Sequence, residues 1–397
     1  MNRVDTAAVH AARNDFRVLG VHAPPLDLST TYPIEDLSDA TADLDAMLGG
    51  DRPRSEKIYA RLDNPTVSRF ERAFAELEHA DDSVAFGSGM AAITAVLLAA
   101  KQRGNHVVAV RPIYGSTDHL LTCGLLGMDV TWATPETVGE SLRKDTSLVM
   151  IETPGNPTLA LVDIADVVRQ AGKVPVVVDS TFATPILQNP IALGATMALH
   201  SATKYIGGHG DVIAGVVATN NEWAKQLRIV RLLTGALLHP MAAYLLHRGL
   251  QTLPIRVRAA QASAMVLAER LTNHDAVEDV RYPGLPGCDP HNIVGTQMAG
   301  PGAMIAFTVH GGHDAAAVMR AVNLATPAVS LGSCDTLIQH PAGLTHRVVE
   351  ADALAEQGIK PGMLRLSVGL EHVEDLWKDL DGALKAAVGA EELVGAR

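Results

Sequence analysis

The chain has 397 residues, of which 47% are hydrophobic and 19% are charged, so it holds ample apolar material for a large globular core. That length accommodates about two or three domains. The formal net charge of -12 at pH 7 and a pI near 5.7 disfavour a nucleic acid or an anionic membrane as the main partner. No uncharged run is long enough to span a membrane, and the first twenty residues carry charges throughout, unlike a signal peptide. We therefore expect a cytoplasmic protein whose chemistry involves small molecules.

The three cysteines are odd in number, far apart and without the spacing of metal ligands: Cys123, Cys288 and Cys334. They predict neither a disulfide framework nor a zinc site, and we expect no metal ion.

The segment before residue 80 holds many prolines and glycines and little periodicity, which predicts an extended arm. Between residues 80 and 220, short apolar runs alternate with helical patterns, which is typical of a mostly parallel sheet with helices on both faces. The predicted strands are 83–86, 107–110, 148–152, 174–179, 198–200 and 212–218, and the predicted helices are 90–100, 116–126 and 163–171.

A helix-rich stretch at 222–271 leads to a second, smaller α/β unit. Its predicted strands are 303–309 and 363–368, and its predicted helices are 314–322 and 373–387. We expect an α/β protein with three parts: an extended N-terminal arm at 1–58, a large ligand-binding domain at 59–252 and a small C-terminal domain at 253–397.

The most informative stretch is 200–211, His-Ser-Ala-Thr-Lys-Tyr-Ile-Gly-Gly-His-Gly-Asp, in which Lys204 stands among hydroxyl side chains and glycines. A lysine amine attacks an aldehyde well only when burial or nearby positive charge lowers its pKa. Hydroxyls and glycine amides suit a phosphate beside it. The pattern indicates a lysine that binds pyridoxal phosphate covalently, although a surface lysine in a glycine-rich turn fits this segment alone equally well.

Two features at the ends of predicted strands fit the same cofactor. Ser88-Gly89-Met90 follows a strand and opens an apolar helix, where free N–H groups and the helix dipole hold phosphate. Asp179 ends an apolar strand 25 residues before Lys204, where a carboxylate could keep the pyridine nitrogen protonated. The alternatives are a simple turn at Gly89 and, for Asp179, a cap for the next turn.

Two further residues could complete such a site. Tyr114 begins a loop-to-helix junction and could stack on the pyridine ring, although a packed tyrosine is more common at such a position. Arg365 lies inside an apolar strand and must therefore be paired, either with a substrate carboxylate or with a structural Asp or Glu.

Together these residues resemble the Cys/Met-metabolism family of pyridoxal-phosphate enzymes, which includes methionine γ-lyases, cystathionine γ-lyases, cystathionine γ-synthases and O-acylhomoserine sulfhydrylases. The resemblance covers nearly the whole chain and is closest to the methionine γ-lyases. It rests on the motifs at 28–32, 59–61, 64–66, 88–90, 114–117, 152–157, 178–181, 201–204, 330–332, 340–341, 345–346 and 364–369.

The resemblance implies an aspartate-aminotransferase-like fold of type I and a homotetramer built from two tight dimers. It implies that Lys204 carries the cofactor and moves protons, that Asp179 pairs with the pyridine nitrogen and that Tyr114 stacks on the ring. The implied cofactor-binding residues also include Ser88, Gly89, Met90, Asn156, Thr181, Ser201 and Thr203, with Tyr59 and Arg61 reaching the phosphate of the neighbouring subunit. The implied substrate-binding residues are Asn156, Ser330, Arg365, Ser116 and His119.

The implied reaction is γ-elimination on methionine or homocysteine, which yields 2-oxobutyrate, ammonia and a thiol or sulfide. The alternatives are γ-replacement, as in O-acetylhomoserine sulfhydrylases and cystathionine γ-synthases, and cystathionine γ-lyase activity. Ser116 matches neither the cysteine of typical methionine γ-lyases nor the glycine of typical cystathionine enzymes. His119 replaces the arginine that cystathionine and O-succinylhomoserine enzymes share, which disfavours a dicarboxylic substrate.

Two other classes of function explain less of the sequence. A nicotinamide-dependent oxidoreductase would use the parallel sheet, but residues 87–92 supply only half of its glycine fingerprint. A noncatalytic scaffold would leave the polar residues at the strand ends without a purpose.

Overall fold

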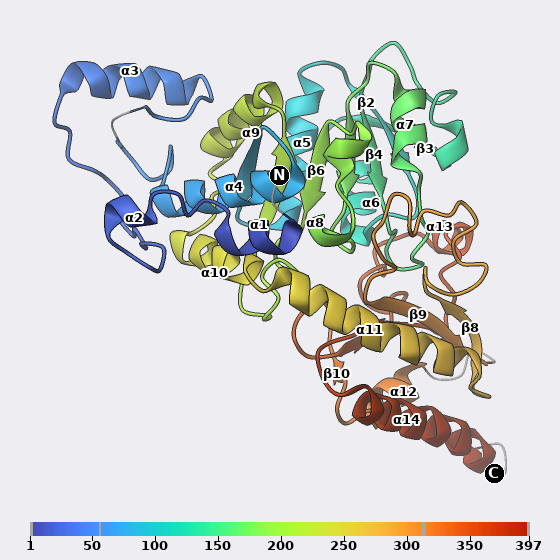
Figure 1. The fold of residues 1–397 in the computed structure, drawn as a ribbon. Coiled ribbons are helices and arrows are strands. Elements are labelled where there is room, and N and C mark those ends of the chain that lie inside the picture. Colours follow the sequence, from blue (N-terminus) through green and yellow to red (C-terminus); the bar gives the residue numbers. More distant parts are fainter. Residues whose placement is uncertain (1–2, 55–56, 311–314, 395–397) are drawn as a thin grey trace.

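Short apolar strands between residues 82 and 219 form the larger of two sheets in the computed structural model, which describes residues 3–54, 57–310 and 315–394 (Figure 1). In spatial order the strands are β1 (Asp82–Phe86), β7 (Gly215–Thr219), β6 (Met197–His200), β5 (Val176–Asp179), β4 (Thr146–Glu152), β2 (His106–Val110) and β3 (Asp129–Ala133). β2 to β6 run parallel, and only β7 pairs antiparallel, with β1 and β6. The prediction of a mostly parallel sheet is confirmed.

Helices cover both faces of this sheet, which is why an interior strand such as β2 is buried along its whole length. Successive side chains of a strand point to opposite faces. Val107 accordingly packs in the apolar cluster with α5, and Val108 packs in the cluster with α7. α5 (Gly89–Lys101) and α9 (Asn221–Thr234) lie on one face, and α4 (Pro65–Glu78) and α7 (Ile164–Ala171) lie on the other. The remaining helices of this unit are α6 (Gly115–Thr122), α8 (Thr184–Leu187), α10 (Pro240–Leu250) and the 3-10 turns Pro135–Thr137 and Pro190–Leu193.

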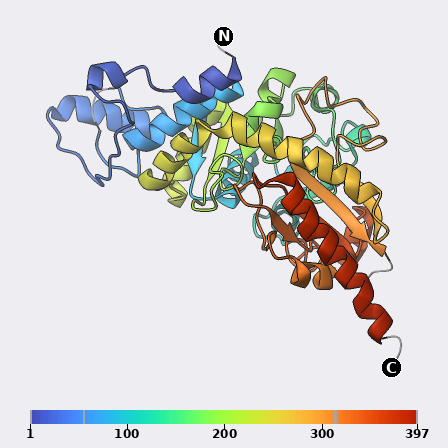
Figure 2. The same ribbon diagram turned by 60° about the horizontal axis from the view of Figure 1, so that its bottom comes forward.

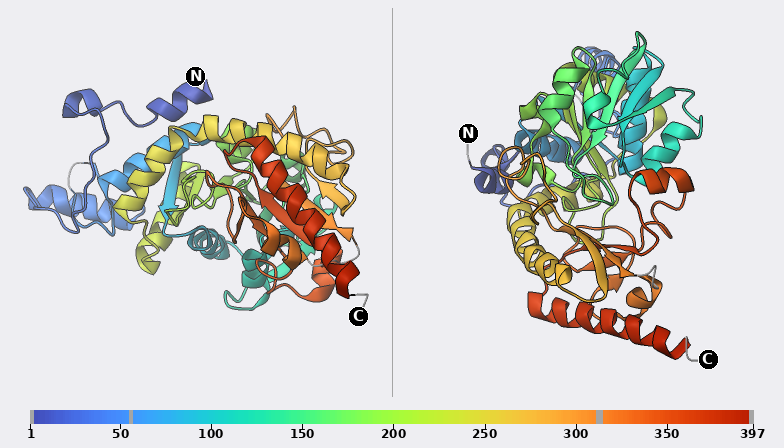
Figure 3. Two further views of the ribbon diagram at one scale, coloured as in Figure 1. Left: turned by 90° about the horizontal axis from the view of Figure 1, so that it is seen from below. Right: turned by 90° about the vertical axis from the view of Figure 1, so that its right-hand side faces the viewer.

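A smaller unit follows the long helix α11 (Leu253–Thr272), which crosses from one unit to the other (Figures 1 and 2). Its sheet is mainly antiparallel, in the order β10 (Thr326–Pro327), β11 (Leu337–Gln339), β12 (Met363–Ser367), β9 (Met304–Val309) and β8 (Val277–Arg281). The other helices here are α12 (Ala315–Ala321), α13 (Ala351–Glu356) and α14 (Val373–Val394). Figure 3 shows α14 along the outer edge of this unit. The expected division between residues 252 and 253 falls at the start of α11 and stays a prediction.

The prediction of an extended arm before residue 80 is wrong for much of that segment. It contains α1 (Val4–His10), α2 (Phe16–Leu19), α3 (Leu37–Leu48) and α4. α4 begins at a strong local signal, because the Asn64 side chain accepts hydrogen bonds from the N–H groups of Thr66 and Val67 and Pro65 occupies the first turn. The other prolines of this segment, Pro24, Pro25, Pro33 and Pro53, lie between the helices. α3 stands apart from the sheet of the large unit (Figure 1).

Two smaller differences have local causes. The helix expected at 116–126 ends at Thr122, because Gly124 takes a left-handed backbone with φ of 74° and stops it. The edge strand β3 was not expected, because its partly exposed sequence lacks a continuous apolar run. No helix among the described residues is both long and apolar enough to cross a membrane.

Candidate active site

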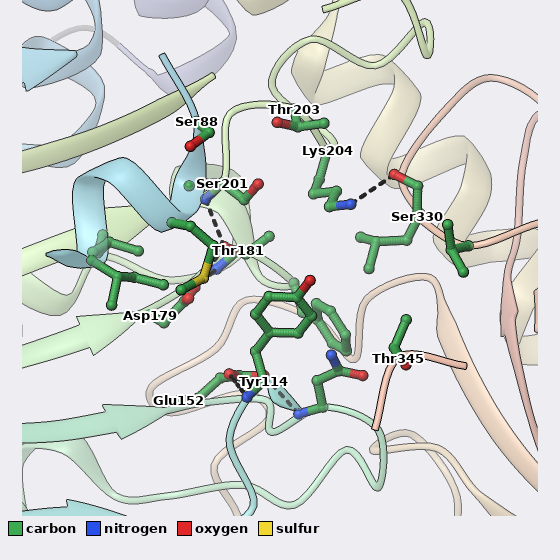
Figure 4. Close-up of a pocket in the computed structure, with 18 of the residues that line it drawn as sticks. Ser88, Tyr114, Glu152, Asp179, Thr181, Ser201, Thr203, Lys204, Ser330 and Thr345 are labelled. Carbon is green, nitrogen blue, oxygen red and sulfur yellow. Dashed lines mark hydrogen bonds between the residues drawn. The ribbon is translucent and has the colours of Figure 1, made fainter. Parts of the chain in front are cut away.

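A cavity of about 490 Å³ opens where the carboxyl ends of β4, β5 and β6 face the loops of the smaller unit (Figure 4). Ligands of open α/β sheets bind at this end of the strands. The cavity is lined by most of the residues expected from the sequence: Ser88, Gly89, Met90, Tyr114, Asn156, Asp179, Thr181, Ser201, Thr203, Lys204, Ser330 and Arg365. It is also lined by residues that were not expected: Ile93, Glu152, Phe182, Leu199, Val329, Leu331, Leu344 and Thr345.

The N-terminus of α5 forms one wall of the cavity. Ser88 caps the helix by accepting a hydrogen bond from the N–H of Ala91 at 3.0 Å, so the helix begins inside the cavity. The first N–H groups of a helix have no partner within the helix. A Cβ atom on Gly89 would lie 2.9 Å from Ser201 Oγ, so only glycine leaves room at this position. The wall therefore suits an anionic group such as a phosphate.

Lys204 lies in the turn after β6 and points its amine into the cavity (Figure 4). The Nζ atom donates a hydrogen bond to Ser330 Oγ at 2.7 Å. Burial, and then the positive charge of Arg365, lower the pKa of Lys204 to about 8. A neutral, nucleophilic amine is therefore accessible near physiological pH, as the chemistry of an aldehyde cofactor requires.

Asp179 ends β5 and is buried in the floor of the cavity. Its Oδ1 atom accepts hydrogen bonds from the N–H of Thr181 at 3.0 Å and from the Thr181 hydroxyl at 2.5 Å. Burial raises the pKa of Asp179, while the two bonds from Thr181 and the nearby His200 lower it. Thr181 Oγ1 also accepts from the N–H of Ser201 at 2.9 Å, which ties Asp179 to the Lys204 turn.

Glu152 is a buried carboxyl group that the sequence interpretation did not assign to the site. It ends β4 and lies opposite Asp179 in the sheet register. Its Oε2 atom accepts from the N–H of Tyr114 and its Oε1 atom from the N–H of Asn156, each at 2.7 Å. Burial and the neighbouring Asp179 raise the pKa of Glu152 well above its usual range. Its position at the end of a predicted strand, the argument used for Asp179, was the signal that could have found it.

Arg365 lies on β12 and is 2% exposed. Its guanidinium donates to Asn156 Oδ1 at 2.6 Å and to the Ser330 carbonyl oxygen at 2.9 Å. Within the described ranges no carboxylate forms an ion pair with it, so the alternative of a structural Asp or Glu partner is not found there. Burial lowers the pKa of Arg365 to about 10. A buried cation that bonds only to neutral oxygens is ready to bind a carboxylate from outside the protein.

Comparison with known proteins identifies the family. Residues 5–385 match the Cys/Met metabolism PLP-dependent enzymes. This chain belongs to that family. It is 54% identical to an L-methionine gamma-lyase of Brevibacterium sandarakinum over 97% of this chain and 98% of that protein. It is 55% identical to an L-methionine gamma-lyase of Streptomyces avermitilis over 96% of this chain and 89% of that protein.

The fold agrees with this membership. A cystathionine gamma synthase from Xanthomonas oryzae pv. oryzae superposes with a TM-score of 0.89 at 35% identity, covering 98% of this chain and 99% of that chain. The prediction of a fold-type-I, aspartate-aminotransferase-like architecture is thereby confirmed, and so are the family and pyridoxal phosphate as its cofactor.

The cavity fits the cofactor of this family. The N-terminus of α5 and the Ser201 and Thr203 hydroxyls would hold the phosphate, and Lys204 would bind the aldehyde. Asp179 would face the pyridine nitrogen and Tyr114 the ring. These roles stay proposals.

Four expected site residues do not line this cavity. Tyr59 and Arg61 line a separate pocket, where the Arg61 guanidinium lies 5.6 Å from the Tyr59 ring and donates to the Leu232 carbonyl oxygen at 3.3 Å. Ser116 and His119 lie on α6, and His119 is exposed to solvent.

Proposed function

We propose that this protein is a pyridoxal-phosphate-dependent carbon–sulfur lyase that carries out γ-elimination on methionine or homocysteine. The products are 2-oxobutyrate, ammonia and a thiol or sulfide. One observation carries this proposal: a lysine of lowered pKa, Lys204, lies in the same cavity as Arg365, a buried arginine that has no ion pair with any described residue. The relatives named L-methionine gamma-lyase, at 54% and 55% identity, support the substrate.

Arg365 binds the carboxylate of the amino acid through its planar fork of N–H donors. Asn156 and the Ser330 carbonyl oxygen hold the guanidinium in place, at 2.6 Å and 2.9 Å. This places the amino group and Cα of the substrate on the side of the cavity where Lys204 points (Figure 4).

Lys204 moves the protons. Its amine is the group in this cavity with a pKa lowered to about 8, so it can take a proton from carbon and return it near physiological pH. Ser330 Oγ orients the Nζ atom towards the substrate. When bound, pyridoxal phosphate withdraws electrons and so stabilises the negative charge that forms at Cα. A second proton is lost from Cβ, the bond between Cγ and sulfur breaks, and the sulfur takes up a proton and leaves as the thiol or sulfide. Hydrolysis by one water molecule then yields 2-oxobutyrate and ammonia.

The assembly is part of the same proposal. Tyr59 and Arg61 contact the phosphate in the neighbouring subunit, so the dimer is the smallest active unit and two dimers form a homotetramer in the cytoplasm. Their position outside the cavity of their own chain supports this arrangement.

A substrate panel tests the activity. The purified holoenzyme is incubated with methionine, homocysteine, cystathionine and O-acylhomoserines, the last with and without a thiol, and 2-oxobutyrate and thioether products are measured. We expect 2-oxobutyrate from methionine or homocysteine. Thioether formation from an acylhomoserine as the main reaction would instead establish γ-replacement, and preference for cystathionine would establish cystathionine γ-lyase activity.

Borohydride reduction tests the cofactor attachment. We expect the reduced cofactor on the peptide that contains Lys204. A label on another lysine would refute the assignment.

A further inference from the structure

Gln339, the last residue of β11, contacts Arg365 but does not line the cavity. The two residues face each other in the antiparallel register of β11 and β12, and Gln339 is 1% exposed. With the Gln339 amide turned so that its oxygen faces the surrounding donors, that oxygen accepts a hydrogen bond from the Thr345 hydroxyl at 3.1 Å and lies 2.9 Å from Arg365 Nη2, 3.1 Å from Nη1 and 3.2 Å from Nε. These near-equal distances place one neutral oxygen over the face of the guanidinium, so the N–H groups in its plane point to other acceptors.

The carboxyl group of Glu152 interacts with Arg365 electrostatically, without a hydrogen bond to it. The oxygens that accept hydrogen bonds from Arg365 are neutral. They belong to the Asn156 side chain and to the Ser330 main chain. A buried arginine is ordinarily paired with a carboxylate, because an unpaired charge is costly to remove from water. In this protein the guanidinium is instead oriented by amide and carbonyl oxygens, and its positive charge is left without a contacting anion among the described residues.

We propose that Gln339 is a positioning residue that determines specificity for α-carboxylates, because its neutral amide fixes the orientation of Arg365 and leaves the full charge available to the substrate. A glutamate at this position would hold the guanidinium equally firmly. It would also neutralise it, so that the substrate carboxylate would meet a neutral ion pair instead of a cation.

The inference rests on the proposed function only in that the substrate is an α-amino acid. It does not depend on the sulfur chemistry, so it is tested with two amines that have no leaving group at Cγ. L-Norleucine carries an α-carboxylate, and n-pentylamine is the same molecule without it. Binding of each to the holoenzyme is followed through the absorbance of the cofactor, and the ratio of the two affinities measures recognition of the carboxylate.

We expect Gln339→Glu to weaken norleucine binding by at least about tenfold and to change pentylamine binding less than about threefold. Gln339→Met introduces a side chain of similar volume without charge. It should reduce the affinity for norleucine relative to pentylamine by less than about threefold. With L-methionine, Gln339→Glu should raise KM and leave kcat within about threefold. Gln102→Glu adds the same charge on an exposed surface and is the matched control.

Unchanged norleucine binding in Gln339→Glu, or an equal loss in Gln339→Glu and Gln339→Met, would overturn the inference. If Gln339→Glu does not fold, Asn156→Asp brings a carboxylate to Arg365 from the other side, and it must reduce the same ratio. A wild-type enzyme without lyase activity would refute the proposed function, whereas the affinity ratio would still decide the role of Gln339.

Discussion

Glu152 and Asp179, at the ends of neighbouring strands, lie directly opposite each other in the sheet, so two carboxyl groups are buried side by side beneath the cavity. The two carboxyl groups have different hydrogen-bond partners. Asp179 is bonded by Thr181 within its own loop, whereas Glu152 accepts hydrogen bonds from the main chains that carry Tyr114 and Asn156. Glu152 thus braces the loop of the expected ring-stacking residue and the loop that orients Arg365.

Glu152→Gln should therefore loosen both loops. An amide has one acceptor oxygen, so one of the two buried N–H groups loses its partner, at a cost of about 1–3 kcal/mol. We expect a lower melting temperature, weaker retention of the cofactor and a higher KM for the amino acid, measured by calorimetry, cofactor absorbance and kinetics. The exposed Glu140→Gln is the control for loss of one negative charge. If Glu152→Gln retained the cofactor as well as the control does, Glu152 would not hold the two loops in place.

The pH dependence of cofactor uptake should report the pKa of Lys204. Only the neutral amine attacks the aldehyde, so the rate of reconstitution of the apoprotein should rise with pH through a midpoint of about 8. Below this midpoint the neutral fraction falls about tenfold per pH unit. Stopped-flow absorbance after addition of pyridoxal phosphate measures the rate, and a midpoint near the ordinary lysine value would contradict the burial argument.

Ser330→Ala should shift this midpoint to lower pH. Ser330 Oγ accepts a hydrogen bond from Lys204 Nζ, and such a bond is stronger when the donor is charged. Loss of the acceptor disfavours the ammonium form and lowers the pKa further. A midpoint that stays at the wild-type value would show that the bond does not discriminate between the two forms of the amine.

Site residues that are marked by a short sequence pattern could be predicted, whereas contacts between distant segments could not. Asp179 ends one short apolar strand and Lys204 follows another. Parallel strands bring their carboxyl ends together, so the presence of both residues in one cavity could be predicted. The contact between Gln339 and Arg365 depends on the register of the antiparallel strands β11 and β12, which are joined by 23 residues. No short sequence pattern determines that register, so the contact could not be predicted.

In the N-terminal segment, a short sequence pattern that marks a helix was present but was not recognised. The capping signal of α4, Asn64 followed by Pro65, was present in the sequence, but the many prolines and glycines around it suggested irregular chain. The proposed intersubunit role of Tyr59 and Arg61 rests on the family resemblance alone, because a contact between subunits leaves no pattern within one chain.

A mixing experiment tests that intersubunit contact. Arg61→Ala should weaken cofactor retention by about 1.5–3 kcal/mol if a charge-assisted bond to phosphate is lost. Chains with Arg61→Ala and chains with Lys204→Ala should each be inactive or weak alone and regain activity when mixed, because a hybrid dimer rebuilds one intact site. Absence of complementation, once subunit exchange is proven by mass spectrometry, would count against a shared site.

His119 is expected to set the choice between substrates with and without a second carboxylate. It lies exposed on α6, outside the cavity lining of its own chain, and a histidine offers no bidentate fork. His119→Arg supplies that fork on a longer side chain. A positioned bidentate contact contributes roughly 1.5–3 kcal/mol, so kcat/KM for cystathionine or O-succinylhomoserine should rise about ten- to a hundredfold relative to homocysteine.

His119→Lys is the matched control, because it adds charge without the planar fork and should give a smaller gain. Equal kinetics of the arginine variant and the wild type, or a wild-type preference for cystathionine over homocysteine and methionine, would exclude this residue as the determinant of substrate choice.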